Sequence, residues 1–247
     1  MLDCSSVGDA RRSLAELLGL SEANLAAHIA RIDIDWSHHS IPPENQVLIQ
    51  LGIDPDMPPK PSAIRWFHAT RALPRSEYEE GLLPTLKAMP MLWQALGTCA
   101  AGWLSPSEWD DYVDSFARND RRFSRQFHQK RMAPDWEGPF AFLVRDAALH
   151  KHRGHKDFTM LCEAAEDICA DFERVHGYAL KAAYQSATRP CLVVFTWPGE
   201  RYGTVRAAAN YVCRTLQGIE CGTDCNANFN GKGEVVPKAL ISTIEWL

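Results

Sequence analysis

Apolar residues recur every three or four positions in several segments, a spacing typical of helices that bury one face. Residues 9–33 predict two such helices, with Gly19 ending the first and Ser21 capping the second. Amphipathic faces of this kind usually pack against the rest of the chain. The pair could instead form a small module that binds a protein partner, and the pattern leaves both interpretations open.

The same spacing predicts longer helices further along the chain. Gly81 is expected to end a short helix, and Ser105 to begin another, with a proline in its first turn. The helices are expected at residues 76–80, through most of 85–133, at 157–174 and at 204–216.

Runs of β-branched and aromatic residues predict the strands. The run 191–197 is unbroken by polar side chains except a threonine, which favours a central, buried strand. The glycine- and asparagine-rich residues 218–233 predict a loop. Helices and strands mixed in this way indicate an α+β fold. The strands are expected at residues 63–71, 138–144 and 191–197, and residues 234–237 and 239–246 are expected to supply one or two final strands.

Prolines divide the chain into parts. They cluster between residues 36 and 62, which predicts an extended linker with one short helix near residues 44–51. We therefore expect an N-terminal helical segment at 1–35, a Pro-rich linker at 36–62 and an α+β domain at 63–247.

Composition and net charge limit the function classes and cellular locations that we expect for the protein. The net charge of −5 over 247 residues argues against a dedicated nucleic-acid coat protein. It does not exclude a nucleic-acid substrate that binds one local basic face. No segment approaches the roughly 18 apolar residues of a membrane span, and the N-terminus lacks a secretion signal. We therefore expect a cytoplasmic protein without a membrane partner, whose eight cysteines are reduced and mostly buried.

The strand at 63–71 carries the first candidate chemistry. Side chains alternate along a strand, so Trp66, His68 and Thr70 share one face. A histidine followed two residues later by threonine can hydrogen-bond a ribose hydroxyl or a carbonyl. The alternative is a histidine packed among aromatic residues without a ligand, which the spacing favours slightly.

The sequence from Trp66 to Arg71, followed by Gly81-Leu82-Leu83-Pro84, resembles the opening of ADP-ribosyltransferase-like domains. This superfamily includes toxins that modify DNA or protein, and the RNA 2′-phosphotransferases. The resemblance implies a split β-sheet core surrounded by helices. It also implies that His68 contacts the nicotinamide-side ribose of NAD, that Thr70 supports His68, and that Arg71 holds the pyrophosphate.

A second segment resembles the end of the same domains. Glu234-Val235-Val236-Pro237 precedes an apolar strand, as a catalytic glutamate does in that superfamily. The resemblance makes Glu234 the carboxylate that stabilises the positive charge on the sugar as nicotinamide leaves. The alternative is that Glu234 has no catalytic role and is a solvated glutamate beside a glycine turn.

The chain departs from the pattern of that superfamily at one position. Many of its members stack a tyrosine on nicotinamide from their second strand, where this chain offers Phe140 and Phe142. Phenylalanine can stack but cannot donate a hydrogen bond. Tyr202 and Tyr211, later in the sequence, are alternatives for that role.

Three charged or metal-binding clusters offer alternative chemistry. Glu163 and Asp167 share a helical face and suit acid–base or metal chemistry, although a solvated acidic face is commoner. The basic stretch 118–131 is either a solvated helix face or a phosphate-binding surface. The third cluster, zinc-like in composition but flanked by basic residues, consists of His150, His152 and His155.

These observations rank three functions. The first is an ADP-ribosyltransferase, a toxin or defence enzyme that uses NAD as a substrate and modifies a protein or nucleic acid. The second is a non-catalytic protein that binds protein or nucleic acid, and the third a metal-dependent hydrolase. We expect no metal, and no G-x-S-x-G, P-loop or G-x-G-x-x-G motif occurs in the sequence.

Overall fold

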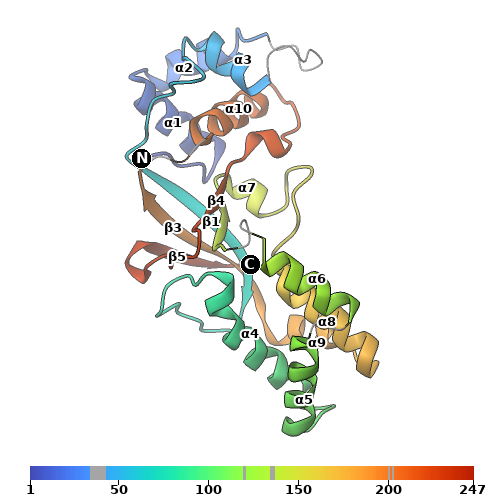
Figure 1. The fold of residues 1–247 in the computed structure, drawn as a ribbon. Coiled ribbons are helices and arrows are strands. Elements are labelled where there is room, and N and C mark those ends of the chain that lie inside the picture. Colours follow the sequence, from blue (N-terminus) through green and yellow to red (C-terminus); the bar gives the residue numbers. More distant parts are fainter. Residues whose placement is uncertain (34–42, 119–120, 134–136, 200, 202) are drawn as a thin grey trace. The chain divides into compact units, whose positions relative to one another are not determined.

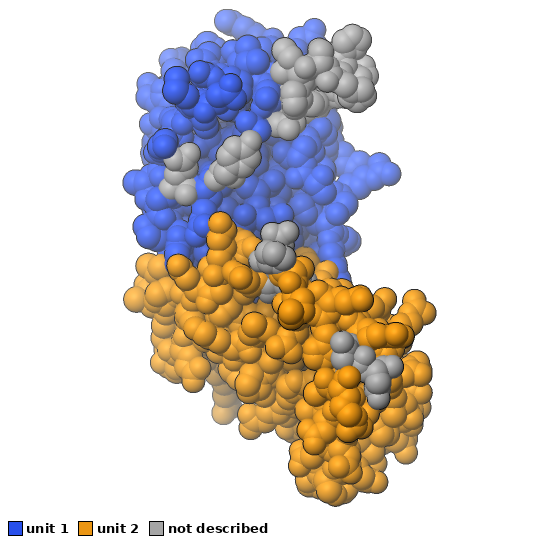
Figure 2. Space-filling view, in the orientation of Figure 1, with its two compact units in different colours: residues 1–68, 141–157, 194–229 blue, residues 69–140, 158–193, 230–247 orange. Residues whose placement is uncertain are grey.

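The computed structural model describes residues 1–33, 43–118, 121–133, 137–199, 201 and 203–247 (Figure 1). Residues 36–42 of the predicted linker lie outside this range. The chain forms two compact units, each assembled from three separate segments (Figure 2). Unit 1 comprises residues 1–68, 141–157 and 194–229, and unit 2 comprises residues 69–140, 158–193 and 230–247.

Five strands form an antiparallel sheet in the order β4-β2-β1-β3-β5, which confirms the predicted α+β fold with a central sheet. In β3 the residues from Cys191 to Phe195 are all buried, as the apolar run predicts. Phe67 of β1 pairs with Phe142 of β2. The strands are β1 (Ala63–Ala72), β2 (Phe140–Phe142), β3 (Arg189–Pro198), β4 (Asn228–Asn230) and β5 (Ile241–Trp246).

Unit 1 packs its helices around α10, whose buried face consists mainly of alanine and valine. α1 and α3 both contact α10, and α2 contacts α1. Leu2 forms a parallel bridge with Ile64 of β1, so the N-terminus also belongs to this unit. The helices are α1 (Val7–Leu18), α2 (Glu22–Ile29), α3 (Pro43–Gln50), α7 (Arg145–Ala148) and α10 (Thr204–Leu216), with the short turn η2 (Thr223–Cys225).

The caps of the first two helices are those that the sequence predicts. Gly19 ends α1 in the left-handed conformation, with φ of 66°, and the Ser21 side chain accepts a hydrogen bond from the backbone of Asn24 in α2. Their apolar faces are buried within unit 1, which supports the packing interpretation of this helical pair.

Unit 2 contains a helical bundle with an aromatic core. Tyr112, Phe116, Phe127 and Phe172 lie in this core, so Phe127 of the basic stretch 118–131 faces inward. A capping box at Ser105 and Glu108 begins α5, as predicted. The helices are α4 (Thr85–Ala100), α5 (Pro106–Ala117), α6 (Arg122–Arg131), α8 (Glu163–His176) and α9 (Leu180–Ala187), with the short turn η3 (Lys238–Leu240).

Three local predictions are wrong. Residues 76–80 form no helix, because Tyr78 within them adopts a positive φ angle of 52° that no helix accommodates. α8 begins at Glu163 instead of residue 157, since the preceding residues form turns. The predicted loop 218–233 contains η2 and the short strand β4.

Among the described residues, no helix is both long enough and apolar enough to cross a membrane.

Candidate functional site

Strand β1 places His68 and Thr70 on the face that carries the fully buried Trp66, and both are half-buried. The boundary between the two compact units falls immediately after His68. His68 and Phe142 therefore belong to unit 1, whereas Thr70, Arg71, Phe140 and Glu234 belong to unit 2. The predicted site residues are thus divided between the units.

Within unit 2, the two segments that resemble ADP-ribosyltransferases lie side by side. Leu82 donates its backbone N–H to the carbonyl of Val236 at 2.9 Å, and Val236 donates to Leu82 at 3.0 Å. This isolated antiparallel bridge is buried, because both side chains are. Glu234 therefore begins a segment that is fixed directly against the turn after β1.

Gly81 makes this close approach feasible. Its φ is +81°, and a Cβ at this position would lie 2.2 Å from the carbonyl oxygen of Val236. Only glycine satisfies both conditions without moving the backbone. The close approach of Val236 thus explains why the Gly-Leu turn of the motif carries a glycine at this position.

A second set of backbone contacts connects the loop before Glu234 to the segment before β2. Gly231 donates to the carbonyl of Pro139 at 3.0 Å, and Gly233 donates to that of Gly138 at 2.9 Å. Phe140 follows directly and is 38% exposed, while Glu234 is exposed. The structure therefore places an accessible aromatic ring and a carboxylate on adjoining segments of unit 2.

Phe142 lies in a different environment from Phe140. It is buried in unit 1, where its ring meets the ring of His155 edge-on at a centroid distance of 5.4 Å. Of the two phenylalanines, Phe140 is thus the one on the segment beside Glu234.

Arg71 contributes to the internal hydrogen bonding of unit 2. Its Nε donates to the Thr188 hydroxyl at 3.0 Å, and its Nη1 donates to the Thr159 carbonyl at 3.0 Å. Its Nη2 donates to the carbonyls of Gln185 at 2.6 Å and Thr188 at 2.8 Å. These bonds connect the end of β1 to the segments around α9, a structural role that the sequence did not indicate.

The acidic face of α8 and the basic stretch of α6 bind each other. Lys130 forms an ion pair of 2.8 Å with Asp167 and lies 4.0 Å from Glu163. Arg121 binds Asp171 through its Nε and Nη2 atoms, and Asp171 is fully buried. Burial raises the pKa of Asp167, which the Lys130 ammonium partly opposes. The acidic and basic clusters thus form ion pairs that join these two helices.

The histidine cluster lies in unit 1 beside α10. The rings of His152 and His155 are 6.5 Å apart, and His152 lies 5.6 Å from the ring of Tyr211. Tyr211 donates to Asp146 at 3.3 Å, a contact the sequence did not indicate. Burial lowers the pKa of both His152 and His155, which favours their neutral forms. Tyr202, the other alternative tyrosine, lies outside the described residues.

Among the residues that the structure describes, no group of three or more histidine, cysteine, aspartate or glutamate side chains is placed to hold a metal ion.

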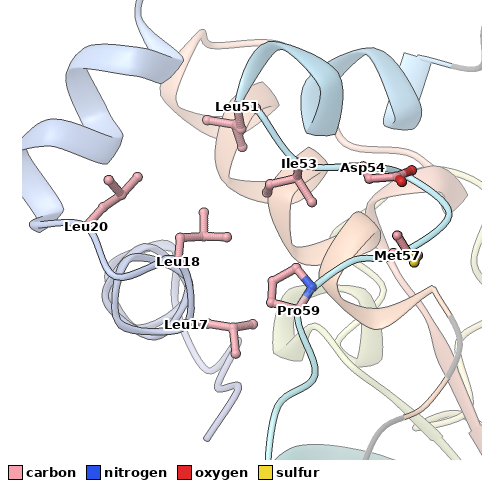
Figure 3. Close-up of a pocket in the computed structure, with 9 residues that line it drawn as sticks. Leu17, Leu18, Leu20, Leu51, Ile53, Asp54, Met57 and Pro59 are labelled. Carbon is pink, nitrogen blue, oxygen red and sulfur yellow. The ribbon is translucent and has the colours of Figure 1, made fainter.

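Unit 1 also contains an apolar groove with a volume of about 430 Å³ (Figure 3). Leucines from the end of α1 face aliphatic side chains from the segment after α3 across this space. Asp54 is the single ionisable side chain among the residues that line it. The lining residues are Leu17, Leu18, Leu20, Leu51, Gly52, Ile53, Asp54, Met57 and Pro59.

Comparisons of this chain with protein-family models, with curated proteins and with solved structures find no match.

Proposed function

We propose that this protein is an ADP-ribosyltransferase-like enzyme that cleaves the N-glycosidic bond of NAD and transfers ADP-ribose to a protein or nucleic acid. The observation that supports it most is the backbone bridge between Leu82 and Val236. The sequence resemblance rests on two short segments far apart in the chain. Their direct pairing within unit 2 supports the proposal, because a shared site requires the two segments to lie close together.

Glu234 supplies the electrostatic part of the proposed reaction. When the bond between ribose C1′ and the nicotinamide nitrogen breaks, both electrons leave with nicotinamide and positive charge develops on the sugar. A carboxylate close to that sugar stabilises the charge. The acceptor then attacks C1′ and releases a proton. NAD and acceptor are thereby converted to ADP-ribosyl acceptor, nicotinamide and one proton.

The other predicted residues orient NAD. His68 hydrogen-bonds the ribose beside nicotinamide, and Thr70 on the same strand face supports it. Phe140, exposed on the segment next to Glu234, packs on the nicotinamide ring, which needs stacking but no hydrogen bond. Arg71 serves the site indirectly by fixing the end of β1, because its guanidinium already donates four hydrogen bonds.

The proposal includes a cytoplasmic location and a toxin or defence role, both of which follow from the family that the motifs resemble. The acceptor is a macromolecule, because that superfamily modifies protein, DNA or RNA.

The test is nicotinamide release from NAD by the purified full-length protein, with and without cell lysate as a source of acceptor. His68→Ala and Glu234→Gln are the test variants. Exposed residues provide matched controls, His28→Ala in α2 and Glu80→Gln in the turn before Gly81. We expect release by the wild type and both controls, and at least a tenfold loss in each test variant.

Two results would contradict the proposal. One is the absence of both nicotinamide release and any NAD-dependent rise in melting temperature in the wild type. The other is release that His68→Ala and Glu234→Gln leave unchanged, since the reaction would then occur elsewhere.

A further inference from the structure

Two histidines in the interior of unit 1 remain unexplained by the proposed function. His152 and His155 lie in the segment that follows α7, and His152 is only 8% exposed. The Nδ1 atom of His152 and the Nε2 atom of His155 are both shielded from solvent, and neither has a hydrogen-bond partner. Such nitrogens are rare in native folds, because a buried polar atom without a partner costs free energy.

Aromatic rings surround the two histidines. The ring of His152 lies 5.6 Å from that of Tyr211 in α10, and the two histidine rings are 6.5 Å apart. The ring of His155 also meets that of Phe142 edge-on at 5.4 Å, and both Tyr211 and Phe142 are buried. Neutral imidazoles suit this environment, whereas an imidazolium would need water or a counter-charge.

Two carboxylates act on His152, and each of them is already bound to other groups. The first is Asp146 in α7. Its carboxylate pairs with the Lys151 ammonium at 2.9 Å and accepts a hydrogen bond from the Tyr211 hydroxyl at 3.3 Å. A proton on His152 therefore gains less from Asp146 than it would from an unpaired carboxylate.

The second carboxylate is Asp224 in η2. It pairs with the Arg214 guanidinium at 2.6 Å and accepts a hydrogen bond from Asn210 at 2.7 Å. Positive charge also lies close to the histidines, on Lys151 beside His152. The titratable groups that act on the two histidines, besides each other, are Asp146, His150, Lys151, Tyr211 and Asp224.

These surroundings make the stability of unit 1 depend on pH. Burial is the main cause that lowers the pKa of both histidines, and for His152 the two carboxylates oppose it only in part. In the unfolded chain both return to the ordinary histidine pKa of about 6.5. Because the folded-state pKa is the lower one, the folded state keeps its full stability above about pH 6.5 and loses stability as the pH falls below that value.

The backbone of segment 150–155 contacts the residues around η2. Arg153 donates its backbone N–H to the carbonyl of Cys221 at 3.2 Å. Gly154 has a φ of +85°, and a Cβ there would lie 3.1 Å from the methyl carbon of Thr223. Since this contact holds the histidines in the interior, the cost of protonating them acts against it.

We propose that His152 and His155 form an acid-sensitive switch that releases segment 150–155 from α10 and η2 when both rings take up protons. Two positively charged rings 6.5 Å apart repel each other, so the second proton adds to the effect of the first. Release exposes both rings to water, which solvates their charge, and raising the pH reverses it. Neither histidine is assigned to NAD, so the switch does not depend on the proposed reaction.

The test measures amide hydrogen exchange of the full-length protein at about pH 7.5 and about pH 5.5, expressed as protection factors that remove the intrinsic effect of pH. We expect the protection of residues 150–155 to fall at least about tenfold at the lower pH, while α5 in unit 2 keeps its protection. The double variant His152→Phe with His155→Phe takes up no proton at either position and should abolish this loss. The exposed His28→Phe in α2 is the matched control and should behave as the wild type does.

The wild-type measurement does not depend on whether the double variant folds. Protection of residues 150–155 that is equal at both pH values would overturn the proposal, and so would an equal loss in α5, which indicates general acid unfolding. The same loss in a double variant with the circular dichroism of the wild type would also overturn it, since another group would then take up the proton. If the double variant does not fold, the ring-proton signals of His152 in the wild type report its protonation, which should coincide in pH with the loss of protection.

Discussion

At the scale of single residues, the neighbours of Cys221 in unit 1 favour its thiolate. A donor to the sulfur stabilises the thiolate, so the hydrogen bond from Cys225 lowers the pKa of Cys221 to about 7. We expect the rate of Cys221 alkylation by iodoacetamide to rise with pH and reach half its plateau near pH 7. Replacing Cys225 by alanine removes the donor, which should move this midpoint upward toward the ordinary value for cysteine, about 8.5.

The measurement is a pH series of alkylation rates, with Cys221 quantified by peptide mass. Cys99→Ser provides the control, because Cys99 lies in unit 2, whereas Cys221 and Cys225 lie in unit 1. A midpoint that Cys225→Ala leaves unchanged would show that another group activates Cys221.

Gly81 is a second residue whose local conformation has a wider effect. Gly81→Ala places a Cβ against the Val236 carbonyl at a positive φ, so it should lower the free energy of unfolding by about 1–3 kcal/mol. Because Val236 lies two residues after Glu234, the same change should also reduce nicotinamide release. Urea unfolding and the release assay measure the two effects.

The control for this change is Gly102→Ala, where a Cβ would meet no atom within 4 Å and φ is not positive. It should leave both measurements close to those of the wild type. Equal stability of the two alanine variants would mean that the bridge between Leu82 and Val236 tolerates displacement at Gly81.

At the scale of elements, α6 and α8 are joined by charge as well as by aromatic packing. Asp171 is fully buried and binds Arg121, whose side chain is 16% exposed. Asp171→Asn leaves the arginine charge without its carboxylate, which should lower the free energy of unfolding by about 3 kcal/mol. The exposed Asp110→Asn in α5 is the matched control and should change it by less than about 0.5 kcal/mol. Urea denaturation followed by circular dichroism distinguishes them, and similar losses in both would remove the ion pair as the cause.

The helices and strands also show which parts of the fold the sequence patterns predict. β1, β3, α5 and α10 were predictable, because their apolar period, proline limits and caps act locally. The turns at 76–80 were not, since their conformation depends on where the Tyr78 side chain is held, in contact with Cys191 at 3.9 Å. Short strands such as β4 carry too few residues for a period to be recognised.

The candidate site shows the same limit. His68, Thr70 and Glu234 were suggested by short motifs, but the neighbouring loop of Phe140 depends on pairing between Gly138 and Gly233. The ion pairs between α6 and α8 likewise join residues distant in sequence. A pattern of residue types identifies charged faces, whereas only the tertiary structure shows which face meets which.

At the scale of the whole molecule, each compact unit combines segments that are distant in the sequence. Unit 1 combines residues 1–68 with two later segments, so the N-terminal helices and the start of β1 belong to one compact body. In α10, the side chains of Ala208, Ala209 and Val212 are fully buried, and α1 and α3 pack on this helix. A fragment starting at residue 63 would expose this face to water.

Deletion of residues 1–62 should therefore prevent unit 1 from folding, although the deletion removes none of the residues assigned to NAD. It removes the bridge from Leu2 to Ile64 and the two helices that cover α10, and exposed apolar surface of this kind promotes aggregation. We expect the 63–247 fragment to aggregate or to lose cooperative thermal unfolding, whereas the full chain unfolds cooperatively. A soluble fragment with the helicity and melting temperature of the full chain would instead mark residue 62 as a true domain boundary. In that case α10 would need a different explanation for its buried face.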